Sequence, residues 1–210
     1  MIWLSRLGWK KVIAAQTEVS FVDGENGHLI YRGHFAKDLA RVRHFEELAY
    51  LLWHGELPDG HEREACFTQW AELREVTGEI KRVIDAIPPS VGMMGVLRTA
   101  VSALESGEMS YPPTLDQAAF ITMKLPTIIA YRYHKLKGTA PVSPRSDLMH
   151  TANYLYMLKG SEAPEAQVKA LEVYLNLMMD HGMNSSTFAA RVIASTGPTW
   201  PLPSRGQSVP

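Results

Sequence analysis

The spacing of apolar residues is the feature that most constrains this fold. Over most of the chain, apolar side chains recur every three or four residues, and short turns with glycine or proline separate these stretches. In FEELAYLLWHG, four apolar side chains share one helical face: Phe45, Leu48, Leu51 and Leu52. Gly55 is the expected stop of that helix, because glycine accepts the left-handed conformation found there. The pattern predicts an all-α, multi-helical fold.

The same spacing predicts six further helices along the chain. They cover residues 62–76, 79–87, 93–107, 114–137, 144–158 and 164–180. Gly78 and Gly160 are expected to end helices. Pro144 and Pro164 are expected in first turns, where a missing N–H costs nothing. Pro126 interrupts the longest stretch and predicts a kink there.

A small β-hairpin is the only clear strand signal, and it lies near the N-terminus. β-forming residues flank the turn sequence DGENG: Val19, Phe21 and Val22 before it, and Leu29, Ile30 and Tyr31 after it. Aspartate, asparagine and two glycines supply the backbone angles that a tight reversal requires. One hairpin is not a fold on its own, so the helices must carry the core.

Composition and charge exclude several classes of function. The 210 residues are 46% hydrophobic and 20% charged, with a formal net charge of −1. No basic excess is available to neutralise phosphates, so we expect no nucleic-acid partner. No apolar run approaches the roughly 18 residues that span a membrane, and Arg6 interrupts an early stretch too short for a secretion signal. The single Cys66, expected to be buried, suits a reducing compartment, so we expect a cytoplasmic protein.

The last residues depart from the helical pattern. GPTWPLPSRGQSVP holds four prolines in fourteen residues and has no periodic apolar face. Such a segment cannot repay the entropy of ordering itself, so we expect residues 197–210 to be disordered. No low-complexity linker divides the body of the chain before this segment. A frameshift or a premature stop would account for the abrupt change.

The stretch DHGMNSS, residues 180–186, carries the strongest signal for a site. Gly182 is expected to end the preceding helix, which places His181 at a carbonyl-rich terminus where the helix dipole favours imidazolium. Asn184 or Ser185 is expected to cap the next helix, whose first amides have no partner inside it. A protonated histidine beside free N–H groups suits a small carboxylate. A helix-terminal histidine without a ligand is the plainer interpretation.

Other chemistries fit this junction less well. Asp180 and His181 are adjacent rather than at ligand spacing, so we expect no metal site. The serines do not form a GxSxG nucleophile elbow, which argues against a hydrolase. We expect structural or solvated roles for the remaining histidines: His28, His34, His44, His54, His61, His134 and His150.

Several ordered motifs resemble the citrate synthase family. DHGMNSSTFAARVIAST is similar to the family segment that carries an oxaloacetate-contacting histidine, and VSFVDGENGHLIYRGHFAKDLA is similar to its N-terminal element. FEELAYLLWHGELP, MMGVLRTAVSAL, KLPTIIAYRYHKLKG and NYLYMLKG follow in the family's order. The similarity covers residues from about 17 to 196. It implies an incomplete citrate synthase-like large domain over residues 17–196, preceded by an extension at residues 1–16, that forms a homodimer through its helices. Residues 91–105 and 114–137 are candidate surfaces, because both stretches are more apolar than one buried face requires; packing in the core is the alternative for both.

The resemblance implies a binding role for two residues. His181 matches the histidine that contacts oxaloacetate, and Asn184 matches the asparagine beside it, which shapes the pocket. Arg191 lies in the matched segment but is expected to be a helix-surface or interface arginine. Met178 stands where many members have a further histidine. The resemblance also implies that no metal or cofactor is bound and that acetyl-CoA is the co-substrate.

Some groups that the resemblance implies are not found in these 210 residues. The family condenses acetyl-CoA with oxaloacetate to citrate and CoA, using a late aspartate as general base and the histidine of a GPLHGG-type loop to stabilise the enolate. Neither has a counterpart here, so we assign no catalytic residue and expect this chain alone to be inactive. A 2-methylcitrate synthase, which uses propionyl-CoA, and a non-catalytic paralogue or helical dimerisation module are the alternatives.

Overall fold

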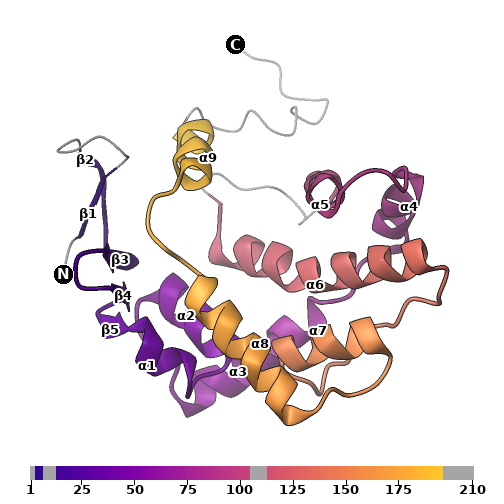
Figure 1. Cartoon of the computed structure of the whole chain (residues 1–210), viewed down its shortest axis with the longest axis horizontal. Coiled ribbons are helices and arrows are strands. Elements are labelled where there is room, and N and C mark those ends of the chain that lie inside the picture. The colour runs from indigo at the N-terminus through magenta and orange to yellow at the C-terminus, as the bar shows by residue number, and fades with distance from the viewer. Residues whose placement is uncertain (1–2, 7–12, 105–112, 196–210) are drawn as a thin grey trace.

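The computed structural model describes residues 3–6, 13–104 and 113–195 of this chain. The strands in these ranges are β1 (Trp3–Arg6), β2 (Ile13–Thr17), β3 (Ser20–Asp23), β4 (His28–Tyr31) and β5 (His34–Phe35). The helices are α1 (Ala36–Ala40), α2 (Phe45–His54), α3 (Gly60–Glu72), α4 (Gly78–Ala86), α5 (Met93–Ser102), α6 (Leu115–Lys137), α7 (His150–Lys159), α8 (Glu165–Met178) and α9 (Ser185–Ser195). Figure 1 shows the strands gathered at one side of a helical body. The prediction of an all-α, multi-helical fold with a small hairpin is confirmed.

The predicted hairpin is formed by β3 and β4. The strands pair antiparallel, with Ser20 opposite Tyr31 and Asp23 opposite His28. Asp23 closes the turn, because its Oδ1 accepts a hydrogen bond from the backbone N–H of Asn26 at 3.1 Å. β5 adds a third strand to the edge of β4. β1 and β2 pair with each other in the region expected to be an extension, which the sequence pattern does not indicate.

Most predicted helices begin and end near the expected residues. α2 ends at Gly55, whose φ is 98°, and α7 ends at Gly160, whose φ is 75°. α6 begins after Thr114, whose Oγ1 accepts from the backbone N–H of Gln117 at 3.2 Å, and it runs through Pro126 as one helix. The kink there stays a prediction. α5 ends at Ser102, and the expected end near residue 107 lies outside the described residues, as does the segment 197–210.

The prediction of a helix over 62–76 that stops at Gly78 is wrong at its C-terminal end. α3 ends at Glu72, and Gly78 is instead the first residue of α4. The reason lies on α6, where Lys124 is buried and its Nζ donates to the backbone carbonyls of Leu73 and Glu75. These carbonyls are satisfied by a side chain from a distant helix, so the backbone leaves the helical path.

The prediction that Pro144 begins a helix is also wrong. α7 begins at His150, and the segment before it has no regular secondary structure. The backbone carbonyls of Arg145 and Leu148 accept hydrogen bonds from Nη1 of the buried Arg74, at 2.9 and 2.6 Å. A charged donor inside the protein therefore fixes this segment in a non-helical conformation.

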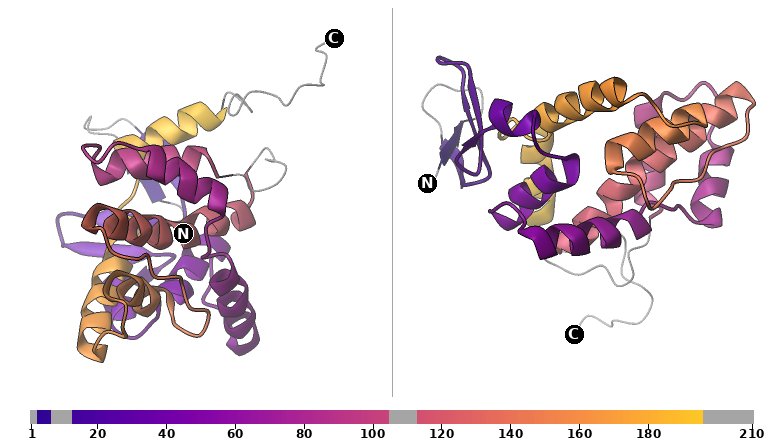
Figure 2. Two further views of the ribbon diagram at one scale, coloured as in Figure 1. Left: turned by 90° about the vertical axis from the view of Figure 1, so that its right-hand side faces the viewer. Right: turned by 90° about the horizontal axis from the view of Figure 1, so that it is seen from below.

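Helix α6 organises the helical body, because it contacts α3, α4, α5 and α7. Figure 2 shows the same arrangement from two further sides. The buried apolar side chains form three clusters, represented by Tyr31, Leu48 and Leu51 beneath the hairpin, Ile84, Val96 and Ile128 around α4–α6, and Trp70 and Met123 between α3 and α6. None of the described helices is both long and apolar enough to cross a membrane.

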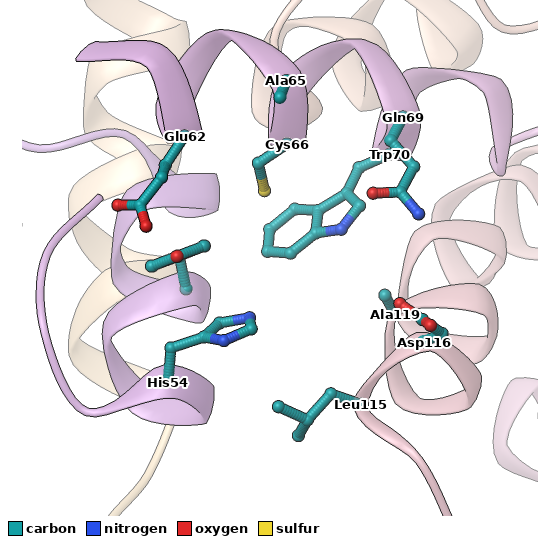
Figure 3. Close-up of a pocket in the computed structure, with 10 residues that line it drawn as sticks. His54, Glu62, Ala65, Cys66, Gln69, Trp70, Leu115, Asp116 and Ala119 are labelled. Carbon is teal, nitrogen blue, oxygen red and sulfur yellow. The ribbon is translucent and has the colours of Figure 1, made fainter. Parts of the chain in front are cut away.

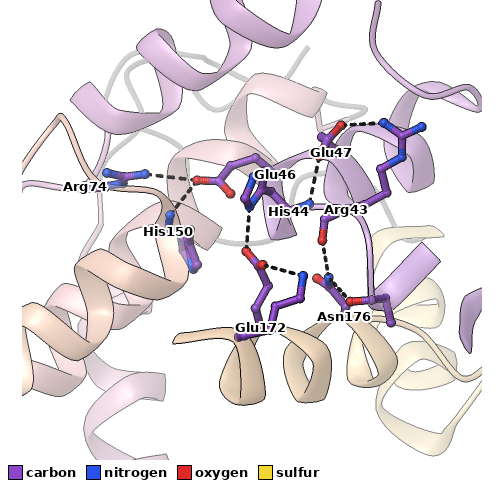
Figure 4. Close-up of polar contacts among 10 residues, drawn as sticks. Arg43, His44, Glu46, Glu47, Arg74, His150, Glu172 and Asn176 are labelled. Carbon is purple, nitrogen blue, oxygen red and sulfur yellow. Dashed lines mark hydrogen bonds and ion pairs between the residues drawn. The ribbon is translucent and has the colours of Figure 1, made fainter. Parts of the chain in front are cut away.

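A buried polar network joins α2 to α7, and the helical pattern did not predict it (Figure 4). Glu46 is fully buried, and its Oε1 accepts from Arg74 Nη2 at 3.2 Å and from the backbone N–H of His150 at 2.7 Å. Burial raises the pKa of Glu46 and lowers the pKa of Arg74. The His150 ring stacks on Phe45 with 4.2 Å between ring centroids. Burial, with Arg74 nearby, lowers the pKa of His150 to about 3, so this histidine is a neutral structural residue.

Candidate functional site

The turn between α8 and α9 carries both predicted site residues. α8 ends at Met178, two residues earlier than predicted, and residues 179–184 lead into α9. The backbone N–H of Asp180 donates to the Tyr31 hydroxyl at 3.4 Å instead of a carbonyl four residues back. The prediction that Gly182 ends this helix, with His181 in its last turn, is therefore wrong. Since the dipole effect falls off within the last turn, it gives no reason for an imidazolium here.

Asn184 caps α9, which is one of the two caps expected from the sequence. Its Oδ1 accepts from the backbone N–H of Thr187 at 2.9 Å, and its carbonyl accepts from the N–H of Phe188 at 2.9 Å. Asn184 Nδ2 lies 3.4 Å from His181 Nε2, within hydrogen-bonding distance. The cap therefore holds the imidazole beside the start of α9, whose first backbone amides have no partner inside the helix.

The hairpin holds this turn in place from the other side. The Ser20 hydroxyl donates to Asp180 Oδ1, and the backbone N–H of Gly182 donates to the same oxygen at 2.7 Å. Sequence reasoning missed Ser20, Tyr31 and Asp180 as parts of the site. The hairpin partners lie 160 and 149 residues from Asp180, and no local pattern signals a contact across that separation.

His181 itself is exposed and lines neither of the two cavities described below. An imidazole, an asparagine side chain and the amide end of α9 thus lie together at this turn, and this group is called the wall below. Such a wall offers a carboxylate one ring nitrogen and backbone N–H donors.

A cavity of about 230 Å³ lies between α2, α3 and the start of α6 (Figure 3). It is lined by Tyr50, His54, Glu62, Ala65, Cys66, Gln69, Trp70, Leu115, Asp116 and Ala119. The rings of Tyr50 and His54 stack with 4.0 Å between centroids. Cys66 is buried, as expected, and burial raises its pKa to about 12, so it is not a thiolate nucleophile at neutral pH. None of these residues belongs to the α8–α9 turn.

A second, open cavity of about 400 Å³ lies between the N-terminal strands and α9. It is lined by Gln16, Thr17, Glu18, Val19, Arg32 and Arg191. Arg191 is exposed, as expected for a surface arginine. The Arg32 guanidinium donates through Nη2 to the backbone carbonyl of Leu52 at 2.9 Å. The placing of two arginines at one cavity was not predicted from the sequence.

Across residues 3–6, 13–104 and 113–195, no group of three or more His, Cys, Asp or Glu side chains is placed to hold a metal ion.

Comparison with known proteins places the chain in a family. Residues 8–200 match the family model described as citrate synthase, C-terminal domain. The citrate synthase of Haloferax volcanii is 37% identical over 90% of this chain, and the 2-methylcitrate synthase of Mycobacterium tuberculosis is 35% identical over 90%. The crystal structure of citrate synthase from Thermotoga maritima covers 90% of this chain with a TM-score of 0.80 and 34% identity.

The chain therefore belongs to the citrate synthase family. The family is one of acyltransferases; its citrate synthases need no metal or prosthetic group, and acetyl-CoA is a co-substrate in the family. The chain spans about half the length of the relatives it matches: 52% of the Haloferax protein, 49% of the Mycobacterium protein and 50% of the Thermotoga structure.

Proposed function

We propose that this chain supplies the oxaloacetate-binding wall of a citrate synthase-type site, with His181 and Asn184 as its binding residues. The observation that carries the proposal is the contact of 3.4 Å between Asn184 Nδ2 and His181 Nε2 at the start of α9. The two residues matched by the family motif thus act as one unit, because the cap that begins α9 also fixes the ring. Oxaloacetate is a dicarboxylate, which suits an imidazole beside unpaired helix N–H groups.

We further propose that residues 1–210 by themselves bind oxaloacetate without condensing it with acetyl-CoA. Removing a methyl proton from acetyl-CoA needs a positioned general base, and the developing enolate oxygen needs a hydrogen-bond donor. No GPLHGG-type loop occurs in the 210 residues. The nearest carboxylate to the ring in sequence, Asp180, is already bonded to Ser20 and to the N–H of Gly182. This oxygen of Asp180 is engaged in holding the turn against the hairpin.

The release of free CoA tests this second part. We expect the purified 210-residue chain, mixed with oxaloacetate and acetyl-CoA, to release no more CoA than a blank without protein. General acid–base catalysis alone contributes roughly 10²–10⁴-fold in rate, so its loss removes any readily measured turnover. A full-length citrate synthase under the same conditions is the positive control. CoA release that depends on both substrates and scales with the concentration of the chain would contradict the proposal.

A 2-methylcitrate synthase is the second candidate, and one observation favours keeping it. The identity to the Mycobacterium 2-methylcitrate synthase is 35%, against 37% for the Haloferax citrate synthase. The same assay with propionyl-CoA in place of acetyl-CoA covers this activity. Both candidates use the oxaloacetate wall in the same way.

We also propose that the chain self-associates through the large-domain helices within residues 91–105 and 114–137. A non-catalytic dimerisation module that uses these helices is the alternative function. On α5, Met94 is 77% exposed, and Leu136 on α6 is 50% exposed. These exposed apolar side chains on the two candidate helices are available for a contact with a second copy. The cytoplasm is the proposed compartment, because the one cysteine of the 210 residues is a free, buried thiol.

A further inference from the structure

The turn from residue 179 to 184 is attached to the hairpin by one carboxylate. Asp180 Oδ1 accepts two hydrogen bonds, one from the hydroxyl of Ser20 on β3 and one from the backbone N–H of Gly182 at 2.7 Å. The backbone N–H of Asp180 in turn donates to the hydroxyl of Tyr31 on β4, at 3.4 Å. A single residue of the turn thus contacts both strands of the hairpin and closes the turn on itself.

The hairpin side of this attachment is rigid, because its two partners lie inside the protein. Ser20 is 3% exposed and Tyr31 is fully buried. Tyr31 also belongs to the apolar cluster against which Leu177 and Met179 pack. The end of α8 and the start of the turn are therefore fixed against the same strands.

This geometry determines where residue 181 lies. Asp180 is bonded inward to the hairpin, and Gly182 is bonded back to Asp180 with a positive φ of 85° that favours glycine. The residue between them is directed outward, and His181 is accordingly exposed. Its ring meets Asn184, the cap of α9, on that outer side.

We propose that Asp180 is a positioning residue for oxaloacetate binding, which acts by holding His181 against Asn184 through the contact with Ser20. This inference rests on the proposed function of His181. It gives the N-terminal hairpin a role in the site, although the hairpin contributes no residue to the binding wall itself. Both hydrogen bonds go to one oxygen, so a neutral side chain that keeps this acceptor is expected to keep the turn in place.

Four variants test the inference with two measurements. Asp180→Ala and Ser20→Ala remove one partner each, the double variant removes both, and Asp180→Asn keeps an oxygen in the same place. We expect Asp180→Ala to weaken oxaloacetate binding about tenfold in calorimetric titration, which corresponds to about 1.4 kcal/mol. Asp180→Asn is expected to restore binding to within about threefold of the wild type. The double variant should bind no more weakly than Asp180→Ala, because Ser20→Ala and Asp180→Ala both break the same contact between Ser20 and Asp180.

The second measurement does not depend on the ligand. The imidazole resonances of His181, assigned by their loss in His181→Ala, are expected to move toward the values of a free histidine in Asp180→Ala and to stay in place in Asp180→Asn. Asp23→Ala is the matched control, because Asp23 accepts hydrogen bonds in the turn of the same hairpin but does not touch residues 180–182. It should leave binding and the resonances unchanged.

The possible outcomes separate the two proposals. If His181→Ala abolishes binding while Asp180→Ala binds like the wild type with unmoved ring resonances, the positioning role is wrong and the proposed function stands. If the wild type does not bind oxaloacetate, the proposed function fails. In that case the ring resonances alone decide whether Asp180 positions His181. Equal losses in Asp180→Asn and Asp180→Ala would also overturn the inference, because they would show that charge matters and not the acceptor.

Discussion

Replacing Arg74 by methionine is expected to lower the free energy of unfolding by about 3–5 kcal/mol, which is the cost of breaking a buried charge pair from one side. Arg74 is 2% exposed, and its guanidinium donates to Glu46 and to the backbone carbonyls of Arg145 and Leu148. Methionine fills much of the space but leaves one carboxylate and two carbonyls without this donor. Urea unfolding followed by circular dichroism measures the change.

Two further variants make this prediction specific to burial. Arg82→Met is the matched control, because Arg82 pairs with Glu79 at 2.9 Å while both side chains are about 70% exposed. Such surface pairs contribute roughly 0–1 kcal/mol, so a small change is expected. Adding Glu46→Gln to Arg74→Met should recover part of the loss, because it removes the unpaired charge. A double variant less stable than Arg74→Met would contradict this account of the network.

Acidification is expected to destabilise the wild type by about 2 kcal/mol between pH 7 and pH 5, relative to a His150→Phe variant. Burial lowers the pKa of His150 from its ordinary value near 6.5 to about 3 in the folded protein. Below pH 6.5 the unfolded chain therefore binds a proton that the folded protein excludes. The contribution of neutral His150 to the free energy of unfolding is complete above pH 6.5 and is lost as the pH falls toward 3. Phenylalanine keeps the stacking on Phe45 without a titratable group.

His44 provides a control of opposite sign for this pH experiment. A hydrogen bond to Glu172, with 3.1 Å between His44 Nδ1 and Glu172 Oε1, raises the pKa of His44. The contribution of His44 to the free energy of unfolding is present below pH 6.5 and is lost as the pH rises. His44→Gln should therefore reduce stability more at pH 5 than at pH 8. Two other charged groups face His150, namely Glu46 and Arg74, and both are retained in the variants. Identical pH profiles for the wild type and His150→Phe would contradict the assignment.

Local sequence signals were sufficient to predict the helical fold class and the turn that carries His181 and Asn184. The glycine stops at Gly55 and Gly160 and the cap at Asn184 depend on residues a few positions apart, and the structure places them as the sequence predicts. The motif around His181 marks the turn, because the family pattern is contiguous in sequence. Its ligand role stays a proposal.

The parts that could not be predicted depend on contacts between distant residues. α3 ends early because Lys124, about 50 residues later, binds the carbonyls of Leu73 and Glu75 just after it. The segment before α7 is not helical, because Arg74 binds the carbonyls of Arg145 and Leu148. Glu46 occupies a helix position typical of a solvated acid, yet a distant arginine makes its burial possible. The contact of Ser20 with Asp180 joins residues that lie 160 positions apart. Helical periodicity reports which face is apolar, but not which polar groups meet inside.

Calorimetric titration of oxaloacetate into the purified chain and into His181→Ala tests the central claim most directly. The account predicts measurable binding by the wild type and a loss of at least about tenfold in the variant, because the imidazole is one of the two side chains proposed to bind the dicarboxylate. Exposed His61, replaced in the same way, is the matched control and should bind like the wild type. Equal affinity of the wild type and His181→Ala, or no heat from either, would contradict the assignment of the α8–α9 turn as an oxaloacetate site.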